Sequence, residues 1–295
     1  MTHRGHIITG TILACLLGVF LLMWLSVLLD MPGSESLGLV DGESAVGIVT
    51  IEGPIYSSRL VVDQIRYLRE DKEVAGMLVR VNSPGGGVAA SQEIYDEVRR
   101  TRESGIPVLV SMGSVAASGG YYVALGADSI MANPGTTTGS IGVIIELPNM
   151  AGLFEKIGYD IQTVQSGRFK DSGGPHRALT EADRTYFQGL IDEFYDQFVS
   201  AVELERPMER DEVLTVADGR VFSGRQAQES GLVDVLGSYE DARRLIREMA
   251  EVEEDAPFIR MPRRQLDWWT LFRETASRWN ASWRSEPSFA YRLFW

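Results

Sequence analysis

Val74 to Gly87 reads VAGMLVRVNSPGGG, a run of apolar residues that ends in three consecutive glycines. The run has the composition of a buried β-strand, and residues 91–102 after it have apolar side chains at helical spacing. Consecutive glycines at such a turn leave backbone N–H groups bare, which suits an oxyanion or a phosphate. The stretch lacks the Lys-Ser/Thr of a phosphate-binding P-loop, so a plain turn between strand and helix is an equal alternative.

The alternation of strand and helix patterns continues along the chain, which predicts an α/β domain with a largely parallel sheet. One helix is predicted after Thr180, an N-cap residue followed by acids in the first helical turn. A second, short helix is predicted to begin with a capping box at Ser223 and to end at Gly231. Tyr239 to Met249 is the last predicted helix. The predicted strands are 46–52, 74–82, 108–112, 129–132, 141–145 and 161–164.

Composition divides the chain into four parts. Residues 1–30 are an apolar head, 31–45 a Gly- and Ser-rich linker, 46–250 the body, and 251–295 a basic, aromatic tail. The formal net charge is −13, and because residues 1–30 are neutral and 258–295 carry +4, the stretch between them holds −17. So acidic a stretch argues against a nucleic-acid partner, because binding of phosphate groups requires a basic face.

Ile7 to Leu29 is an uncharged run of 23 residues, long enough at about 1.5 Å per residue to cross a bilayer core. Its length and the absence of a small-x-small site after it favour a retained signal anchor over a cleaved signal peptide. Arg4 before the run and acids after it predict a cytoplasmic N-terminus and an extracytoplasmic body. Cys15, in the middle of the run, is interpreted as a small apolar side chain of the membrane helix rather than a lipoprotein cysteine.

Histidine and cysteine are scarce: the chain has three His and one Cys, and only His176 lies beyond residue 15. Disulfide frameworks and zinc sites need these residues in groups, so no metal or other cofactor is expected. A hydrolytic mechanism in the body must therefore use His176 or proceed without imidazole.

Ser118 lies in the stretch AASGGYY, residues 116–122, between a strand pattern and a helix pattern. Small neighbours leave its hydroxyl accessible, and the N–H of Gly119 could face an anion formed beside it. The stretch resembles a nucleophile elbow without matching the G-x-S-x-G form, and a helix N-cap serine is the alternative.

Lys170 lies in a second glycine-rich stretch, SGRFKDSGGP, residues 166–175. A lysine in such a loop is ordinarily a solvated cation. It acts as a base only where its surroundings favour the neutral amine.

These motifs together resemble the signal peptide peptidase A family of serine peptidases, family S49, which has the spiral ββα fold of Clp protease and crotonase. The resemblance covers about residues 46–240 and rests on five motifs in the family's order. They are NSPGGG (82–87), ASGGYY (117–122), GSIGV (139–143), SG with KD (166–171) and GRVFSGRQA (219–227).

The resemblance implies a Ser-Lys dyad with Ser118 as nucleophile and Lys170 as general base. It further implies an oxyanion hole from the N–H groups of Gly85 and Gly119, and a hydrogen bond from Ser140 that orients the lysine. A dyad of this kind needs no histidine, in agreement with the composition. His176 stays open as an alternative base, although a lone loop histidine is more often solvated.

The resemblance also implies an assembly of eight subunits in which serine and lysine meet across a subunit boundary. Its implied substrates are remnant signal peptides and other apolar peptides in the cell envelope. A related protease that cleaves one membrane-protein partner and a non-catalytic scaffold with the same fold are the alternatives.

The tail from residue 258 onward contains five of the six Trp and seven Arg. Part of it could form an interfacial helix on anionic lipid. Packing on a neighbouring subunit through its aromatic side chains is the other interpretation, and the residues leave the two open.

Overall fold

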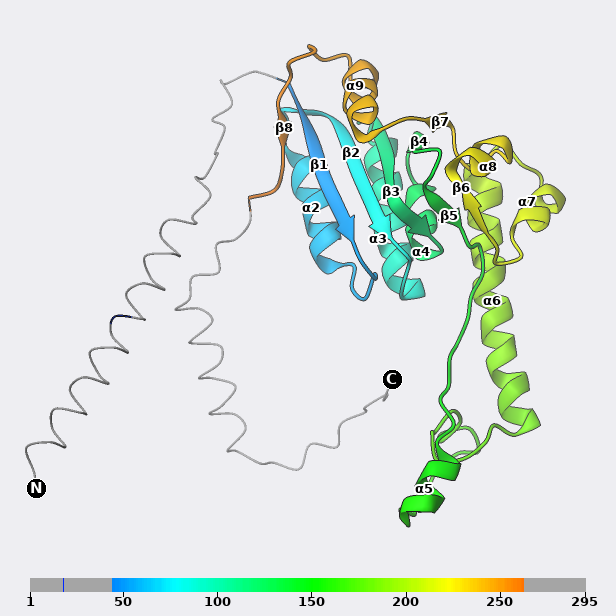
Figure 1. Ribbon diagram of the computed structural model, residues 1–295. Helices are drawn as coiled ribbons and strands as arrows, with labels where there is room; N and C mark the ends of the chain where they lie inside the picture. Colours follow the sequence, from blue (N-terminus) through cyan, green and yellow to red (C-terminus); the bar gives the residue numbers. More distant parts are fainter. Residues whose placement is uncertain (1–17, 19–43, 263–295) are drawn as a thin grey trace, which may run out of the picture. The chain divides into compact units, whose positions relative to one another are not determined.

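The computed structural model describes residue 18 and residues 44–262, and its centre is a parallel β-sheet (Figure 1). Strands β1 (Ala45–Glu52), β2 (Val74–Ser83) and β3 (Val108–Ala117) lie side by side in parallel. Ile48 of β1 pairs with Leu78 of β2, and Leu78 pairs with Leu109 of β3. The predicted α/β class is therefore confirmed.

Shorter strands extend the sheet on both sides, in the order β6-β5-β3-β2-β1-β8. Strand β8 (Phe258–Ile259) pairs with β1, so two residues assigned to the tail belong to the sheet. Strand β4 (Ser129–Ala132) pairs with the first half of β3 and carries β7 (Val235–Leu236). Strand β5 (Thr137–Gly139) pairs with the last residues of β3, and β6 (Val221–Ser223) joins β5 as its antiparallel neighbour.

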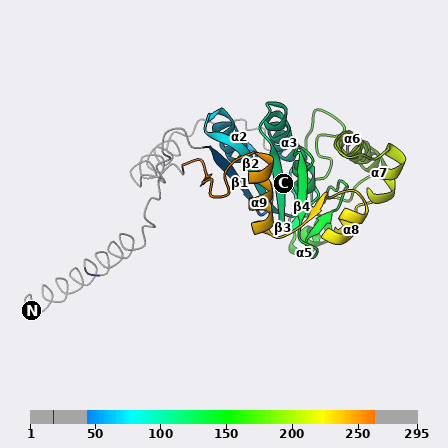
Figure 2. The same ribbon diagram turned by 90° about the horizontal axis from the view of Figure 1, so that it is seen from above.

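Helices cover the two faces of the sheet, as the side-chain alternation of the strands requires. Helices α2 (Arg59–Glu70), α3 (Val88–Glu103) and α4 (Gly119–Ala124) pack on one face, against inward residues such as Val79 and Val110. Helix α9 (Tyr239–Met249) packs on the other, where its Ile246 contacts the cluster around Leu78 (Figure 2). Burial of each such aliphatic side chain contributes about 1.5–3 kcal/mol, so both layers hold the sheet in place.

An extended segment, residues 144–190, leaves the body after β5 and is called the arm below. It contains α5 (Ala151–Ile157) and the first half of α6 (Glu181–Glu205), which runs back to the sheet (Figure 1). The second half of α6 is anchored by Phe198, Val199 and Val202, which are buried in the main core. Helices α7 (Arg210–Val216) and α8 (Gly224–Glu229) complete the body beside it.

The predicted helix boundaries are confirmed where capping residues mark them. Thr180 and Ser223 each form a capping box, α9 spans residues 239–249, and α3 begins three residues before its predicted start. Two predicted strands are wrong: 141–145 and 161–164 lack strand structure, and Val164 is fully exposed. A β-rich run becomes a strand only with a partner, and β6 already occupies the edge of β5 that 141–145 would need.

The predicted signal anchor, Ile7 to Leu29, lies outside the described residues except for Gly18, and so do most of the linker and residues 263–295 of the tail. Within the part that is described, no helix combines the length and apolar character needed to cross a membrane.

Asp241 stabilises the start of α9 through a reciprocal cap. Ser238 donates its N–H and its hydroxyl to the Asp241 carboxylate at 2.8 and 2.6 Å, and the Asp241 N–H donates to Ser238 Oγ at 3.2 Å. These hydrogen bonds, with a contribution from Arg244, lower the pKa of Asp241 to about 2.

We expect Asp241→Asn to lower the melting temperature by a few degrees at pH 7, because an ionised cap is lost. The carboxylate stabilises the fold above its ordinary pKa of about 3.9 and loses its effect as the pH falls through about 2. The difference from the wild type, followed by thermal denaturation, should therefore shrink between pH 4 and pH 2. Glu240→Gln, in the same helical turn, is the control, and a pH-independent difference would contradict the assignment.

Candidate active site

Ser118 lies at the sharp turn between β3 and α4, with φ 53° and ψ −120°. Positive φ is uncommon for a residue with a side chain, and such strain is held only where the surroundings fix it. Here the Ser118 N–H donates to the Gly139 carbonyl at 2.8 Å, and its own carbonyl accepts from the Tyr122 N–H at 2.9 Å. The side chain makes no capping hydrogen bond, so the N-cap alternative does not account for this serine.

The turn after β2 lies directly against the turn that carries Ser118. A Cβ on Gly85, whose φ is +100°, would lie 2.7 Å from the Gly119 nitrogen, and a Cβ on Gly119 would lie 2.4 Å from Ser91 Oγ. Neither position has room for a side chain. Glycine at both allows the two backbones to touch, which places main-chain N–H groups beside the serine hydroxyl.

The N–H groups of the glycine turn after β2 differ in their partners. The Gly85 N–H donates to Ser83 Oγ at 3.1 Å, and the Gly87 N–H donates to the Ile55 carbonyl at 2.8 Å. Gly86 lies between them, lines the same cavity as Ser118, and has its nitrogen 3.2 Å from the site of a Cβ on Gly119. The resemblance points to Gly85, and Gly86, whose only signal in the sequence is its place in the triple-glycine run, is a second candidate donor.

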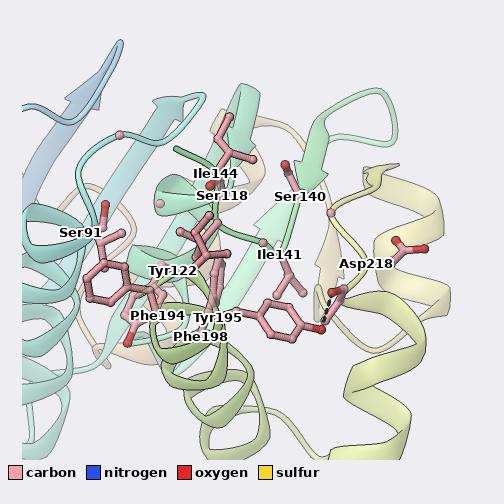
Figure 3. A pocket seen from close by; sticks show the side chains of 18 of the residues that line it. Ser91, Ser118, Tyr122, Ser140, Ile141, Ile144, Phe194, Tyr195, Phe198 and Asp218 are labelled. Carbon is pink, nitrogen blue, oxygen red and sulfur yellow. Dashed lines mark hydrogen bonds between the residues drawn. The ribbon is translucent and has the colours of Figure 1, made fainter. Parts of the chain in front are cut away.

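Ser118 opens into a cavity of about 620 Å³ between the sheet and α6 (Figure 3). Aromatic side chains of α4 and α6 gather on one wall, and Tyr195 closes that side by donating its hydroxyl to the Ala217 carbonyl at 2.7 Å. Tyr122 packs against Phe198 with ring centroids 4.9 Å apart, and burial raises its pKa. The apolar part of the lining is formed mainly by Tyr122, Ile141, Val143, Ile191, Phe194 and Phe198.

Ser140 lines the same cavity as Ser118, also with a positive φ, of 51°. Its N–H donates to the Arg220 carbonyl at 2.8 Å, which anchors this turn to the strand β6 region. The structure thus brings Ser118, Gly119 and Ser140 of the predicted site together. Gly85 contacts Gly119 but is not among the residues that line the cavity.

No lysine, arginine or histidine of residues 44–262 lines this cavity. Its carboxylates are Asp192, which accepts a hydrogen bond from Gln188 at 2.7 Å, and Asp218. Hydrogen bonds from Arg220 lower the pKa of Asp218, which makes it a weak base. Among the described residues of one chain, the cavity therefore contains the Ser118 hydroxyl but no strong general base.

Lys170 and His176 both lie on the arm. Lys170 is exposed in the loop between α5 and α6. Figure 1 shows that this loop lies at the end of the arm away from the sheet. His176 is half-buried, with its Nε2 3.6 Å from the carboxylate of Asp171, and it lines a separate, smaller hollow beside α5. The structure of one chain therefore does not bring either predicted base to Ser118.

Comparison with known proteins identifies the family. The profile described as peptidase family S49 matches residues 100–253, just over half of the chain, and that of Clp protease matches residues 45–138. The chain belongs to peptidase family S49, the family of signal peptide peptidase A. Its α/β sheet is accordingly of the Clp protease and crotonase kind.

Curated relatives of this S49 peptidase carry protease names. A putative protease of Synechocystis sp. is 45% identical over 186 residues, which cover 63% of this chain and 67% of that protein. A putative signal peptide peptidase SppA of Enterococcus faecium is 43% identical over 63% of this chain and 54% of its own length. The chloroplastic serine protease SPPA of Arabidopsis thaliana is 32% identical over 74% of this chain and 34% of its own. The latter two relatives extend well beyond the shared region.

We expect Gly119→Ala to reduce peptidase activity by at least about 10-fold, because its methyl group would displace Ser91 Oγ or tilt α4 away from the glycine turn. Ser91→Ala in the same chain removes the clashing oxygen and should restore part of the activity. Cleavage of a fluorogenic apolar peptide measures both effects.

Gly189→Ala is the matched control, because a Cβ at Gly189 on α6 meets no atom within 4 Å. It should leave activity unchanged. Wild-type activity in Gly119→Ala would show that the contact between the two turns is not needed.

Proposed function

We propose that this peptidase is a membrane-anchored serine endopeptidase that uses a Ser118–Lys170 dyad on apolar peptides, remnant signal peptides among them. The neutral amine of Lys170 would take the hydroxyl proton as Ser118 Oγ attacks the peptide carbonyl, and would then return that proton to the leaving amine. Water, deprotonated by the same amine, would release the acyl group.

The N–H groups of Gly119 and Gly86 are proposed as the oxyanion donors. This assignment replaces Gly85, because the Gly85 N–H already donates to Ser83 Oγ. Gly86 meets the two requirements of such a donor: it lines the cavity and lies across from Gly119. Ser140 is proposed to orient the lysine amine, since it lines the cavity with Ser118.

One observation carries the proposal of a shared site: residues 44–262 of one chain bring the serine but no strong base to the cavity, and Lys170 is exposed on the arm. A second subunit could supply the lysine. The arm also exposes large apolar side chains, including Leu153, Ile157 and Tyr159, which is typical of a surface that another copy covers. We therefore propose a homo-oligomer, an octamer by family resemblance, with each dyad completed across an interface.

The apolar lining of the cavity supports apolar peptide substrates. An anchor in residues 1–30 and a linker in 31–45 would hold residues 46–250 close to the outer side of the cytoplasmic membrane, where apolar peptide fragments remain after export. The proposed reaction requires no cofactor.

Labelling with a serine-directed fluorophosphonate tests the dyad. The wild-type protein should label at Ser118, located by mass spectrometry, and Ser118→Ala should not label. Lys170→Ala should lower kcat by about 10²–10⁴-fold and labelling in parallel, because the hydroxyl loses its base. His176→Gln is the control and should retain activity; loss of labelling in His176→Gln with none in Lys170→Ala would exchange their roles.

Mixing two inactive chains tests the shared site. Random hetero-oligomers of Ser118→Ala and Lys170→Ala chains should recover about one quarter of the wild-type activity, since one interface in four pairs an intact serine with an intact lysine. Mixing Lys170→Ala with the double variant Ser118→Ala/Lys170→Ala is the control and should recover none. Failure to recover activity in oligomers verified by two affinity tags would contradict a site shared between subunits.

A further inference from the structure

Arg177 binds two carboxylates at the foot of α6. Its Nε and Nη2 donate to the two oxygens of Asp171 at 3.1 and 2.9 Å, and its Nη1 donates to Asp183 Oδ2 at 2.7 Å. Asp183 is also the third residue of α6, and its carboxylate completes the capping box by accepting the N–H of the N-cap residue Thr180 at 2.9 Å. Ser172 donates its hydroxyl to the other Asp183 oxygen. The loop is thereby fastened to the start of the helix.

This cluster is partly shielded from water. The Asp183 side chain is 4% exposed, that of Asp171 17% and that of Arg177 28%. The hydrogen bonds of Arg177 lower the pKa of both Asp171 and Asp183 and raise that of Arg177 itself. A planar guanidinium that forks onto one carboxylate and reaches a second imposes geometry as well as charge, which lysine could not do.

Lys170 lies in the middle of the segment that the cluster holds. On its C-terminal side Asp171 is bound by Arg177, and on its N-terminal side the Phe169 ring stacks on Tyr186 of α6, with centroids 5.1 Å apart. The Lys170 N–H donates to the Gly167 carbonyl at 3.1 Å, which closes the turn. The backbone of the lysine is therefore fixed from both sides although its side chain is exposed.

The same contact controls the charge beside the lysine. The Asp171 carboxylate, one residue away, would favour the charged ammonium form of Lys170 if it were free. Both of its oxygens are occupied by Arg177. The other charged or titratable groups that contact this segment include His176, 3.6 Å from Asp171, and Arg168, which lies over the Phe169 ring. Helix α6 adds Asp183 and Tyr186, which stacks on Phe169.

We propose that Arg177 is a positioning residue for Lys170: it fastens the lysine loop to the N-terminus of α6 and keeps Asp171 from pairing with the lysine amine. The inference rests on the proposed function, in which Lys170 is the general base. Arg177 itself touches neither the substrate nor the reacting atoms. Its effect on the reaction passes through the place and the charge of Lys170.

The test compares kcat, KM and the pH dependence of kcat/KM in the full-length protein in detergent. Arg177→Gln should lower kcat by about 10- to 100-fold with little change in KM, because the base is misplaced. It should also move the acid limb of kcat/KM to higher pH, because the freed Asp171 carboxylate favours the ammonium form. Asp171→Asn/Arg177→Gln removes that carboxylate, so the acid limb should return to the wild-type pH while kcat stays low.

Arg177→Lys retains the positive charge but loses the two-point contact of the guanidinium with Asp171. It should leave the acid limb of kcat/KM at the wild-type pH and give a kcat between those of the wild type and Arg177→Gln. Arg184→Gln, which removes an exposed arginine from the first turn of α6, is the matched control and should behave as the wild type. An imidazole also titrates between pH 5 and 8, so the series is repeated with His176→Gln. Thermal denaturation establishes that each variant is folded at the assay temperature.

An unmoved acid limb in Arg177→Gln overturns the inference, whether or not kcat falls, because a loss of packing alone would lower the rate without shifting the limb. Failure of the second substitution, Asp171→Asn, to restore the limb overturns it as well. Neither result touches the proposed function, which fails separately if Lys170→Ala remains active.

Discussion

The backbone contact between the turn after β2 and the turn after β3 is the constraint on which the site depends. Gly85 and Gly119 approach so closely that a Cβ at either would overlap backbone or Ser91 Oγ. Ser118, beside this contact, has a positive φ that is held by its hydrogen bonds to Gly139 and Tyr122. The parallel strands β2 and β3, which end side by side, hold the strained backbone of Ser118 in place. The Ser118 hydroxyl makes no capping hydrogen bond.

The body and the arm contribute different parts of the proposed chemistry. The body is rigid: its sheet is packed on both faces, and its glycine turns hold N–H groups beside Ser118. The arm carries Lys170 on a loop that Arg177 and Asp183 fasten to α6. Because α6 continues into the core through Phe198 and Val202, the lysine is tied to the fold of its own chain even though it is proposed to act on the serine of another.

Apolar surface on the arm connects assembly with catalysis. Side chains such as Leu153 and Ile157 are costly to expose to water, so a second copy that covers them would gain free energy from association. In the proposed assembly that same association completes the dyad. The described part of a single chain then holds the serine and a partly apolar cavity without the base needed for hydrolysis.

The sequence by itself determined the elements whose signals are local. Strands β1, β2 and β4 follow from apolar runs, α6, α8 and α9 from their capping residues, and Ser118 from its small neighbours in the chain. The runs 141–145 and 161–164 misled because strand formation depends on a free neighbouring edge, which no local pattern reveals.

Only the tertiary structure decided which groups meet. Gly86 lines the cavity, whereas the Gly85 N–H donates to Ser83 Oγ and the Gly87 N–H to the Ile55 carbonyl. Ser140 joins Ser118 because β5 pairs with the end of β3, whereas Lys170 stands apart at the end of the arm. Arg177 binds Asp171 and Asp183 because the loop folds back on α6. Such contacts depend on distances in space between residues far apart in the chain, and motif order alone carries no information about them.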